Sequence, residues 1–268
     1  MPSLSVPGAV VDFDVAEHSG STGPAVVPLH GLTSSRQRDS PLGLEIGRGL
    51  SPDSPRAARV LRYDARGHGA SSGGTRPGDY SWARLAEDLD ALLDHVFPGE
   101  AVHGVGPSMG TGTLLHAAVA DPARFRTLTL VVPPTAWATR RGQSAGYEEM
   151  ANLVETAGVA AFVAAGRAST PPPAVAGAPD TVPDVPDHLL PSVLRGAATA
   201  DLPPPEALTR LLQPTLILAW TEDPTHPLST ATALQDLLPH SRLDVAERPE
   251  DVATWPSAFR DHVRASIG

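Results

Sequence analysis

The 268-residue chain is 41% hydrophobic and 19% charged, an ordinary balance for a globular protein of one large domain or of a core domain with an insertion. Its formal net charge of −10 argues against nucleic acid or an anionic membrane surface as a partner. The chain has no cysteine and no lysine, which excludes disulfides, thiolate metal sites, cysteine nucleophiles and lysine Schiff bases. No apolar stretch approaches the ~20 residues of a membrane-spanning helix and no secretion signal is evident, so we expect a cytoplasmic protein without a membrane segment.

The N-terminal part of the chain predicts two strands. Residues 9–17 alternate apolar and polar side chains, which is typical of a half-buried strand. Residues 25–31 form a continuous apolar run that suits a sheet covered on both faces. The turn between the two indicates a hairpin start that feeds a central strand. A first helix is predicted within residues 41–50.

The next region predicts a strand, a helix and a further strand. The apolar run at 58–72 ends in a glycine-rich turn, and Ser81 is the expected N-cap of the helix that follows. Leucines form an apolar stripe along this helix, while its acidic residues are predicted to face water: Glu87, Asp88, Asp90 and Asp94. Residues 125–134 have the pattern of another buried strand. Strands that alternate with amphipathic helices indicate an α/β fold, a parallel sheet with helices on both faces.

The alternation breaks down between residues 135 and 209. This region has one helical pattern, at 146–165, and then becomes proline-rich, and a structureless loop of this length is uncommon in a compact domain. We therefore predict a small, mostly helical insertion at 135–209, with a core formed by residues 1–134 and 210–268. The core pattern resumes with a strand at 214–220, a helix at 229–238, a strand at 242–246 and a helix at 256–267.

Residues 101–119 hold the motif that is most informative about function. A short apolar run leads into Gly106-Pro107-Ser108-Met109-Gly110, which is followed by an Ala- and Leu-rich segment of helical character. Strand, tight turn and helix in this order are the context of a nucleophile elbow. The chain packs so closely around the serine of an elbow that glycine is needed two residues before it and two after it. We therefore predict that Ser108 is a reactive serine.

Four motifs in this order resemble those of the α/β-hydrolase superfamily, and the resemblance covers essentially the whole chain. They are His30-Gly31 after the third strand, the turn at 64–69 after the fourth, the elbow after the fifth, and Asp223 after a late strand. The resemblance implies an α/β-hydrolase fold, with a mostly parallel sheet and with the insertion as a helical cap.

The resemblance also implies roles for individual residues. The backbone amides of Met109 and Leu32 are the expected oxyanion hole, and Asp223 is the expected acid that orients a catalytic histidine. His30 corresponds to a histidine that commonly ties loops together in the superfamily. Arg66 and His68 are likewise expected to fix loops beneath the site.

The largest departure from the superfamily is a missing histidine. The superfamily normally carries its catalytic histidine in the loop after the last strand, yet residues 246–255 contain none. One possibility is relocation to His226, which follows Asp223 by three residues in the same turn. His240 is expected at the wrong end of a strand, and His262 lies well inside the last helix. The alternative interpretation of His226 is a loop histidine with no chemical role.

The missing histidine is also compatible with substitution by a carboxylate or with loss of hydrolysis. A carboxylate from the loop after the last strand would take the role of the base if it were buried under the cap; the candidates are Glu247, Glu250 and Asp251. If hydrolysis has been lost, the chain binds a ligand or runs another reaction. Trp220 adds weight to this alternative, because the superfamily commonly has a small residue before the acid and an indole there would fill or line the pocket.

The sequence therefore predicts a serine hydrolase that cleaves an ester, thioester or lactone bond of a small, mainly apolar substrate. The predicted route is an acyl-enzyme on Ser108, with His226 as the provisional base. The alternative function is a catalytically weak or non-hydrolytic protein that binds or converts a biosynthetic small molecule. His30, Trp137 and Trp220 are candidates for the substrate pocket. We expect a small-molecule substrate and no cofactor or metal ion, and the sequence predicts no oligomeric state.

Overall fold

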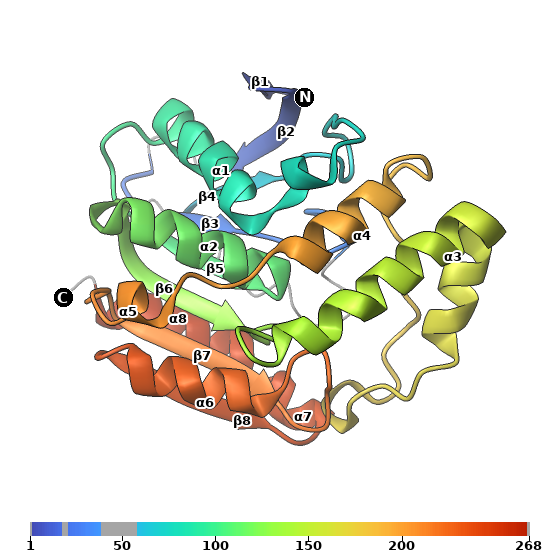
Figure 1. Cartoon of the computed structure of the whole chain (residues 1–268). Helices are drawn as coiled ribbons and strands as arrows, with labels where there is room; N and C mark the ends of the chain where they lie inside the picture. Colours follow the sequence, from blue (N-terminus) through green and yellow to red (C-terminus); the bar gives the residue numbers. More distant parts are fainter. Residues whose placement is uncertain (1, 18–20, 39–57, 267–268) are drawn as a thin grey trace.

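The chain folds around one eight-stranded sheet with the strand order β1-β2-β4-β3-β5-β6-β7-β8 (Figure 1). The computed structural model describes residues 2–17, 21–38 and 58–266. The strands β3 to β8 run parallel, whereas β1 pairs antiparallel with β2, and β2 antiparallel with β4. The strands are β1 Ser3–Val6, β2 Ala9–Ala16, β3 Ala25–Pro28, β4 Arg59–Tyr63, β5 Val102–Pro107, β6 Phe125–Val131, β7 Thr215–Trp220 and β8 Ser241–Ala246.

The hairpin at the start of the chain differs from the predicted one. The β2 strand turns back on β1 through Gly8, whose φ of +82° favours glycine, and β4 separates β2 from β3. The burial of the strands accounts for this order. The three residues of 25–27 are buried on both faces and need a neighbour on each side, whereas β2 alternates between buried and partly exposed residues and suits a place near the edge.

Helices cover both faces of the sheet. The helices α1, α2 and α6 pack on one face, and α8 packs on the other, where Trp255 and Phe259 are fully buried. The α-helices are α1 Trp82–Val96, α2 Met109–Ala120, α3 Arg140–Arg167, α4 Leu190–Thr199, α5 Pro205–Leu208, α6 Leu228–Leu237, α7 Pro249–Val252 and α8 Trp255–Ala265. Single 3-10 turns lie at Pro77–Tyr80, Pro122–Arg124 and Pro173–Val175. The helix predicted within 41–50 lies outside the described residues.

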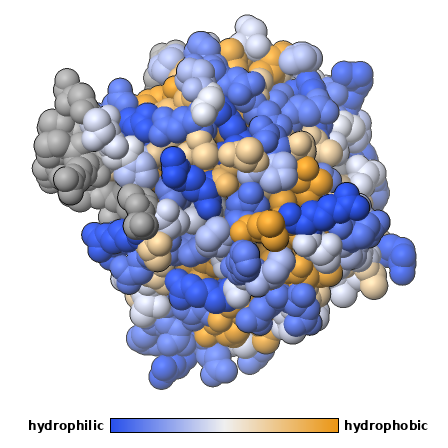
Figure 2. Space-filling model, turned by 90° about the vertical axis from the view of Figure 1, so that its left-hand side faces the viewer, coloured by the Kyte–Doolittle hydropathy of each residue, from blue (hydrophilic) through white to orange (hydrophobic). Residues whose placement is uncertain are grey.

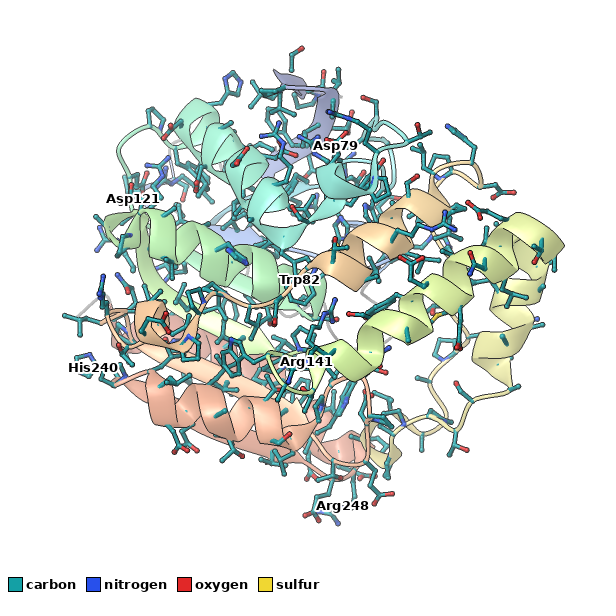
Figure 3. All side chains as sticks on the ribbon, viewed as in Figure 1. Asp79, Trp82, Asp121, Arg141, His240 and Arg248 are labelled. Carbon is teal, nitrogen blue, oxygen red and sulfur yellow. The ribbon has the colours of Figure 1, made fainter. Side chains whose placement is uncertain are left out.

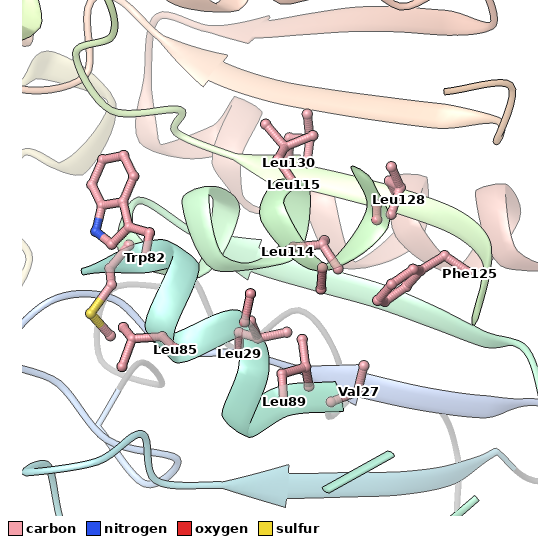
Figure 4. Close-up of a cluster of buried hydrophobic side chains, with 14 of the residues drawn as sticks. Val27, Leu29, Trp82, Leu85, Leu89, Leu114, Leu115, Phe125, Leu128 and Leu130 are labelled. Carbon is pink, nitrogen blue, oxygen red and sulfur yellow. The ribbon is translucent and has the colours of Figure 1, made fainter. Parts of the chain in front are cut away.

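The main core forms where α1 and α2 meet the central strands (Figure 4). Leu85 and Leu89 of the predicted stripe are buried there, and the Ser81 hydroxyl accepts a hydrogen bond from the Arg84 amide at the start of α1. The two helices approach closely at Gly112, where a Cβ would lie 2.3 Å from the Trp82 ring. A side chain at 112 would therefore push α1 away from α2.

Asp88 corrects the prediction that the acidic residues of α1 face water. Its side chain is 3% exposed and accepts two hydrogen bonds of 2.6 Å from the Arg66 guanidinium, which is 1% exposed. The apolar stripe on α1 is wide enough to bring Asp88 to its edge, and Arg66 from the glycine-rich turn meets it there. Glu87 and Asp94, in contrast, are exposed, whereas Asp90 is half-buried.

The segment 135–209 is mostly helical, as the loss of strand–helix alternation predicts. Figure 1 shows α3 and α4 side by side beyond the ends of the parallel strands, and α3 has a kink at Gly158, whose φ is +82°. Buried residues of both helices form a separate cluster that includes Tyr147 and Leu194. The end of the segment belongs to the main core instead, because Ala200, Leu202 and Leu208 are buried in that cluster.

The described surface is mainly polar. Figure 2 shows the face turned away from α3, where apolar residues form small patches among hydrophilic ones. Large hydrophobic side chains that are exposed within the described part of the chain are Val10, Val182 and Leu212. None of the described helices combines the length and the hydrophobicity needed to cross a bilayer.

Candidate active site

Ser108 lies at the apex of a tight turn between β5 and α2. Its φ of 50° and ψ of −110° are unusual for a residue with a side chain, and its amide donates to the Val131 carbonyl at 3.0 Å. The glycines on either side are required by close packing. A Cβ at Gly106 would lie 2.7 Å from the Gly110 backbone, and one at Gly110 would lie 3.0 Å from the Leu29 side chain. The strained backbone presents the serine hydroxyl at the C-terminal edge of the sheet.

His226 connects Ser108 to Asp223. Its Nε2 lies 2.8 Å from the Ser108 Oγ, and its Nδ1 lies 2.8 Å from the Asp223 Oδ2. A carboxylate only accepts hydrogen bonds, so the proton belongs on Nδ1, which leaves Nε2 to accept from the serine hydroxyl. This is the arrangement in which a histidine is ready to take the serine proton. The structure therefore brings all three predicted catalytic residues together.

The loop from Trp220 to His226 organises the Asp223 carboxylate. Oδ1 accepts from the amides of Thr225 at 2.8 Å and His226 at 3.2 Å, while Oδ2 accepts from the Trp220 indole Nε1 at 2.8 Å as well as from the His226 ring. Burial alone would raise the pKa of Asp223, but the hydrogen bonds from His226, Trp220 and Thr225 outweigh it and hold this pKa well below its usual value. The carboxylate is therefore ionised at neutral pH.

Asp223 and His226 are only three residues apart, and a hydrogen bond from outside the loop helps to hold the loop that carries both. The Thr135 amide, just after β6, donates to the Thr225 carbonyl at 2.9 Å and ties the loop to the neighbouring strand end. Pro227 stands at the start of α6, where a proline is well tolerated.

The other histidines near the C-terminus lie elsewhere. His240 is exposed, and its Nδ1 lies 2.9 Å from the Leu212 carbonyl; Figure 3 places it at the end of the sheet remote from α3. His262 is buried in α8 with its Nε2 3.2 Å from the Leu128 carbonyl.

The carboxylates after β8 have local roles or are exposed. Asp251 accepts hydrogen bonds from the amides of Glu247 and Arg248 and so caps the short helix α7. Glu247 and Glu250 are exposed to solvent. No burial of the kind that the substitution hypothesis requires is therefore seen for these two glutamates.

The two backbone amides predicted to form the oxyanion hole belong to Met109 and Leu32. Met109 is the first residue of α2, and Leu32 follows the His30-Gly31 pair at the end of β3. Within the described part of the chain neither amide donates a hydrogen bond to another residue. The unpaired amides at the start of a helix also favour negative charge.

His30 is part of the scaffold that holds these loops. Its Nε2 accepts from the Ala65 amide at 2.9 Å, and its Nδ1 lies 2.9 Å from the Gly31 carbonyl, to which it donates. His68 packs against it with a ring separation of 5.1 Å. Burial lowers the pKa of His30 to about 4 and that of His68 to about 3, so both rings are neutral at pH 7.

Buried neutral histidines make the stability of the fold sensitive to acid. His103, buried in β5, has its pKa lowered to about 4, again mainly by burial. Because His30, His68 and His103 bind protons more readily when unfolded, with a pKa near 6.5, stability is lost as pH falls from about 6.5 towards 4. At pH 5, each of these three histidines should lower the free energy of unfolding by about 2 kcal/mol. We expect a marked fall in Tm between pH 7 and pH 5 in thermal unfolding; equal Tm values at the two pH values would contradict this.

Trp137 and Trp220, two candidates for the pocket, both have their indole N–H groups engaged. The Trp137 Nε1 donates to the Pro203 carbonyl at 3.1 Å, and its amide is held by the Asp201 carboxylate. Trp220 is 5% exposed and donates a hydrogen bond to Asp223, so it supports the Asp223 carboxylate. The role of Trp220 in this support is the feature that sequence reasoning missed.

A cavity of about 340 Å³ lies under the second half of α3. Its walls include Phe162, Val163 and Gly166 of α3, Val175, Pro183, and Thr33 of the loop that follows Leu32. The ion pair of Arg167 with Asp180, at 2.8 Å, is exposed and also borders the cavity. His30, Trp137 and Trp220 do not line it.

The described residues offer no cluster of three or more histidine, aspartate and glutamate side chains that could hold a metal ion. The chemistry that the site itself supports comes from Ser108, His226 and Asp223 together with the two backbone amides. This set of groups can activate a hydroxyl and stabilise an oxyanion.

Comparisons with known proteins agree with this architecture. Residues 24–153 match the family model described as the alpha/beta hydrolase fold. The chain is 32% identical over 220 residues to 3-oxoadipate enol-lactonase 2 of Acinetobacter baylyi, which covers 77% of each protein. A hydrolase from Pseudomonas aeruginosa superposes with a TM-score of 0.78 and 25% identity over 100% of this chain and 98% of that one. The enol-lactonase from Burkholderia xenovorans shares the fold, with a TM-score of 0.77 at 20% identity over 98% of this chain and all of the other. The chain therefore belongs to the α/β-hydrolase family.

Proposed function

We propose that this protein is a serine hydrolase that cleaves ester-type bonds, lactones among them, through an acyl-enzyme on Ser108. The observation that carries the proposal is the continuous hydrogen-bonded chain from the Ser108 hydroxyl through the His226 ring to the Asp223 carboxylate. The similarity to enol-lactonase 2 of A. baylyi supports hydrolysis at an ester-type bond. It does not fix the substrate, because related folds carry many chemistries.

The first half of the reaction forms the acyl-enzyme. The His226 Nε2 takes the Ser108 proton as Oγ attacks the substrate carbonyl, and the imidazolium that forms is stabilised by the ionised Asp223. The amides of Leu32 and Met109 bind the negative oxygen of the tetrahedral intermediate, and each such donor contributes about 3 kcal/mol to the transition state. His226 then returns the proton to the leaving alkoxide, and the C–O bond breaks.

The second half releases the acid. A water molecule loses a proton to the His226 Nε2 and attacks the acyl carbon, and the same two amides hold the oxyanion. The Ser108 Oγ leaves with the proton that His226 carries. The carboxylic acid product departs, and the site returns to its starting state.

The segment 135–209 is proposed to act as the cap over the site. Its chain at 182–184 is fixed to the loop after β3, since the Asp184 amide donates to the Thr33 carbonyl at 2.8 Å and Arg38 donates to the Val182 carbonyl at 2.7 Å. The cavity below α3 reaches Thr33, one residue beyond the proposed oxyanion amide of Leu32. Its apolar wall residues, among them Phe162 and Val163 of α3, suit an uncharged hydrocarbon part of the substrate.

Hydrolysis of p-nitrophenyl acetate and butyrate tests the proposed function. Wild-type protein is expected to turn over both esters, and Ser108→Ala is expected to lower kcat by at least about 10³-fold. Ser257→Ala, at an exposed serine of α8, is the matched control and should retain the wild-type rate. If Ser108→Ala hydrolyses the esters as fast as Ser257→Ala, the serine-hydrolase proposal is wrong.

The cavity makes a separate prediction about chain length. Gly166 lines the cavity, and a Cβ there meets no atom within 4 Å, so Gly166→Leu should fill part of the space while leaving the helix intact. At about 0.8 kcal/mol per displaced methylene, kcat/KM for p-nitrophenyl octanoate should fall about tenfold, with acetate little changed.

The matched control for this prediction is Gly142→Leu. Gly142 lies in the first turn of the same helix, is exposed, and also has no atom within 4 Å of a built Cβ. It should leave both esters unaffected. Equal ratios of octanoate to acetate activity in Gly166→Leu, Gly142→Leu and wild type would show that the cavity does not hold the acyl chain.

A further inference from the structure

We infer that Trp220 is a positioning residue of the reaction, which holds the Asp223 carboxylate through its indole N–H. This inference rests on the proposed function of Ser108 and His226. The Trp220 Nε1 donates to the same oxygen, Oδ2, that accepts the proton-bearing nitrogen of His226, and both distances are 2.8 Å.

The indole is held rigidly in this position. Trp220 is the last residue of β7, 5% exposed, and it stacks on Trp255 with ring centroids 6.1 Å apart and an angle of 21° between the rings. The Trp220 and His226 rings also form a T-shaped pair, with their centroids 6.1 Å apart and an angle of 83° between the ring planes. Because Trp220 is buried at the end of a strand, the direction of its N–H group is set before any substrate binds.

The Trp220 indole completes the set of hydrogen bonds to the Asp223 carboxylate. Oδ1 accepts hydrogen bonds from the amides of Thr225 and His226. Oδ2 accepts hydrogen bonds from the Trp220 indole and the His226 ring, so each oxygen has two donors. Four donors from one seven-residue loop leave the carboxylate a single orientation, which in turn fixes the ring that faces Ser108.

The N–H also withdraws negative charge from Oδ2. Without it, the carboxylate would attract the imidazolium that forms during the reaction more strongly. From α3, the ionisable group that senses the charge of Asp223 is Tyr147, and burial raises the pKa of that phenol above its usual value of 10. Tyr147 therefore stays uncharged at neutral pH.

Trp220→Phe and Trp255→Phe form a matched pair of variants. Each keeps an aromatic ring in the stack and loses an indole N–H, but the Trp255 N–H is buried without a hydrogen-bond partner in the described structure, whereas the Trp220 N–H serves Asp223. The measurements are kcat, KM and the pH profile of kcat/KM with p-nitrophenyl butyrate, with Ser108→Ala measured alongside.

We expect Trp220→Phe to lower kcat about tenfold at unchanged KM and to move the acidic limb of the profile upward by about half a pH unit. Trp255→Phe should retain the wild-type profile. If Trp220→Phe and Trp255→Phe give the same kcat and the same acidic limb, the indole only packs and the inference is overturned. Failure of the proposed function itself would appear separately, as activity that survives Ser108→Ala.

Discussion

His226→Ala is expected to lower kcat for ester hydrolysis by about 10⁴-fold, because the serine loses the only base that the structure places on its hydroxyl within the described residues. The Ser108 Oγ would then have to attack as a neutral alcohol, and water would meet the acyl-enzyme without a proton acceptor. KM should change little, since the ring contacts the reacting hydroxyl and is not required for the cavity under α3. Steady-state kinetics with p-nitrophenyl butyrate measures both constants.

The matched control for this substitution is His240→Ala. His240 is exposed, lies at the end of the sheet remote from the site, and should be replaceable without loss of activity (Figure 3). Equal Tm values for the two variants would show that the fold is intact. If His226→Ala retains most of the wild-type rate while Asp251→Asn loses it, the base is a carboxylate of the loop after β8 and the assignment of His226 is wrong.

Asp88→Ala is expected to destabilise the protein by about 3–5 kcal/mol, because it leaves the Arg66 guanidinium buried without its carboxylate. Arg66 is 1% exposed and loses two charge-assisted hydrogen bonds in a place that water does not reach. Its turn also carries Ala65, whose amide binds His30, so the loss should loosen the loop that leads to Leu32. Urea denaturation gives the free energy of unfolding directly.

Asp94→Ala, on the same helix, is the control for the stability prediction. The Asp94 side chain is 79% exposed and lies 3.3 Å from the Arg124 guanidinium, so its loss should cost less than about 1 kcal/mol. The comparison separates burial from charge, because both variants remove one aspartate from α1. Similar free energies of unfolding for the two variants would refute the account of the Arg66 pair.

The fold could be predicted from the sequence because its signals are local. Apolar runs, the capped helix at 82 and the order of the motifs together indicate an α/β-hydrolase, and the eight-stranded sheet and the family comparisons confirm it. The position of β4 between β2 and β3 could not be predicted in the same way. Strand order depends on contacts between distant segments, and the turn before residue 25 carries no information about which strand lies alongside.

The candidate site was predictable in parts. The elbow at Ser108 is visible because close packing requires Gly106 and Gly110 on either side of it. The relation of His226 to its partners depends on the path of the loop, which the spacing of three residues permits without requiring. The burial of Asp88 and the donor role of Trp220 could not be predicted for the same reason. Asp88 depends on Arg66 from a separate turn, and Trp220 depends on the fold of the loop that carries Asp223.

The most direct test of the central claim is mass spectrometry of the acyl-enzyme. Wild-type protein mixed with p-nitrophenyl butyrate and quenched in acid within the first turnovers should carry one butyryl group, and peptide mapping should place it on Ser108. The butyryl ester is predicted on Ser108 because, among the described residues, only the Ser108 hydroxyl is hydrogen-bonded to the His226 ring. A butyryl group on another residue, or steady hydrolysis with no acylated Ser108 at any quench time, would contradict the account.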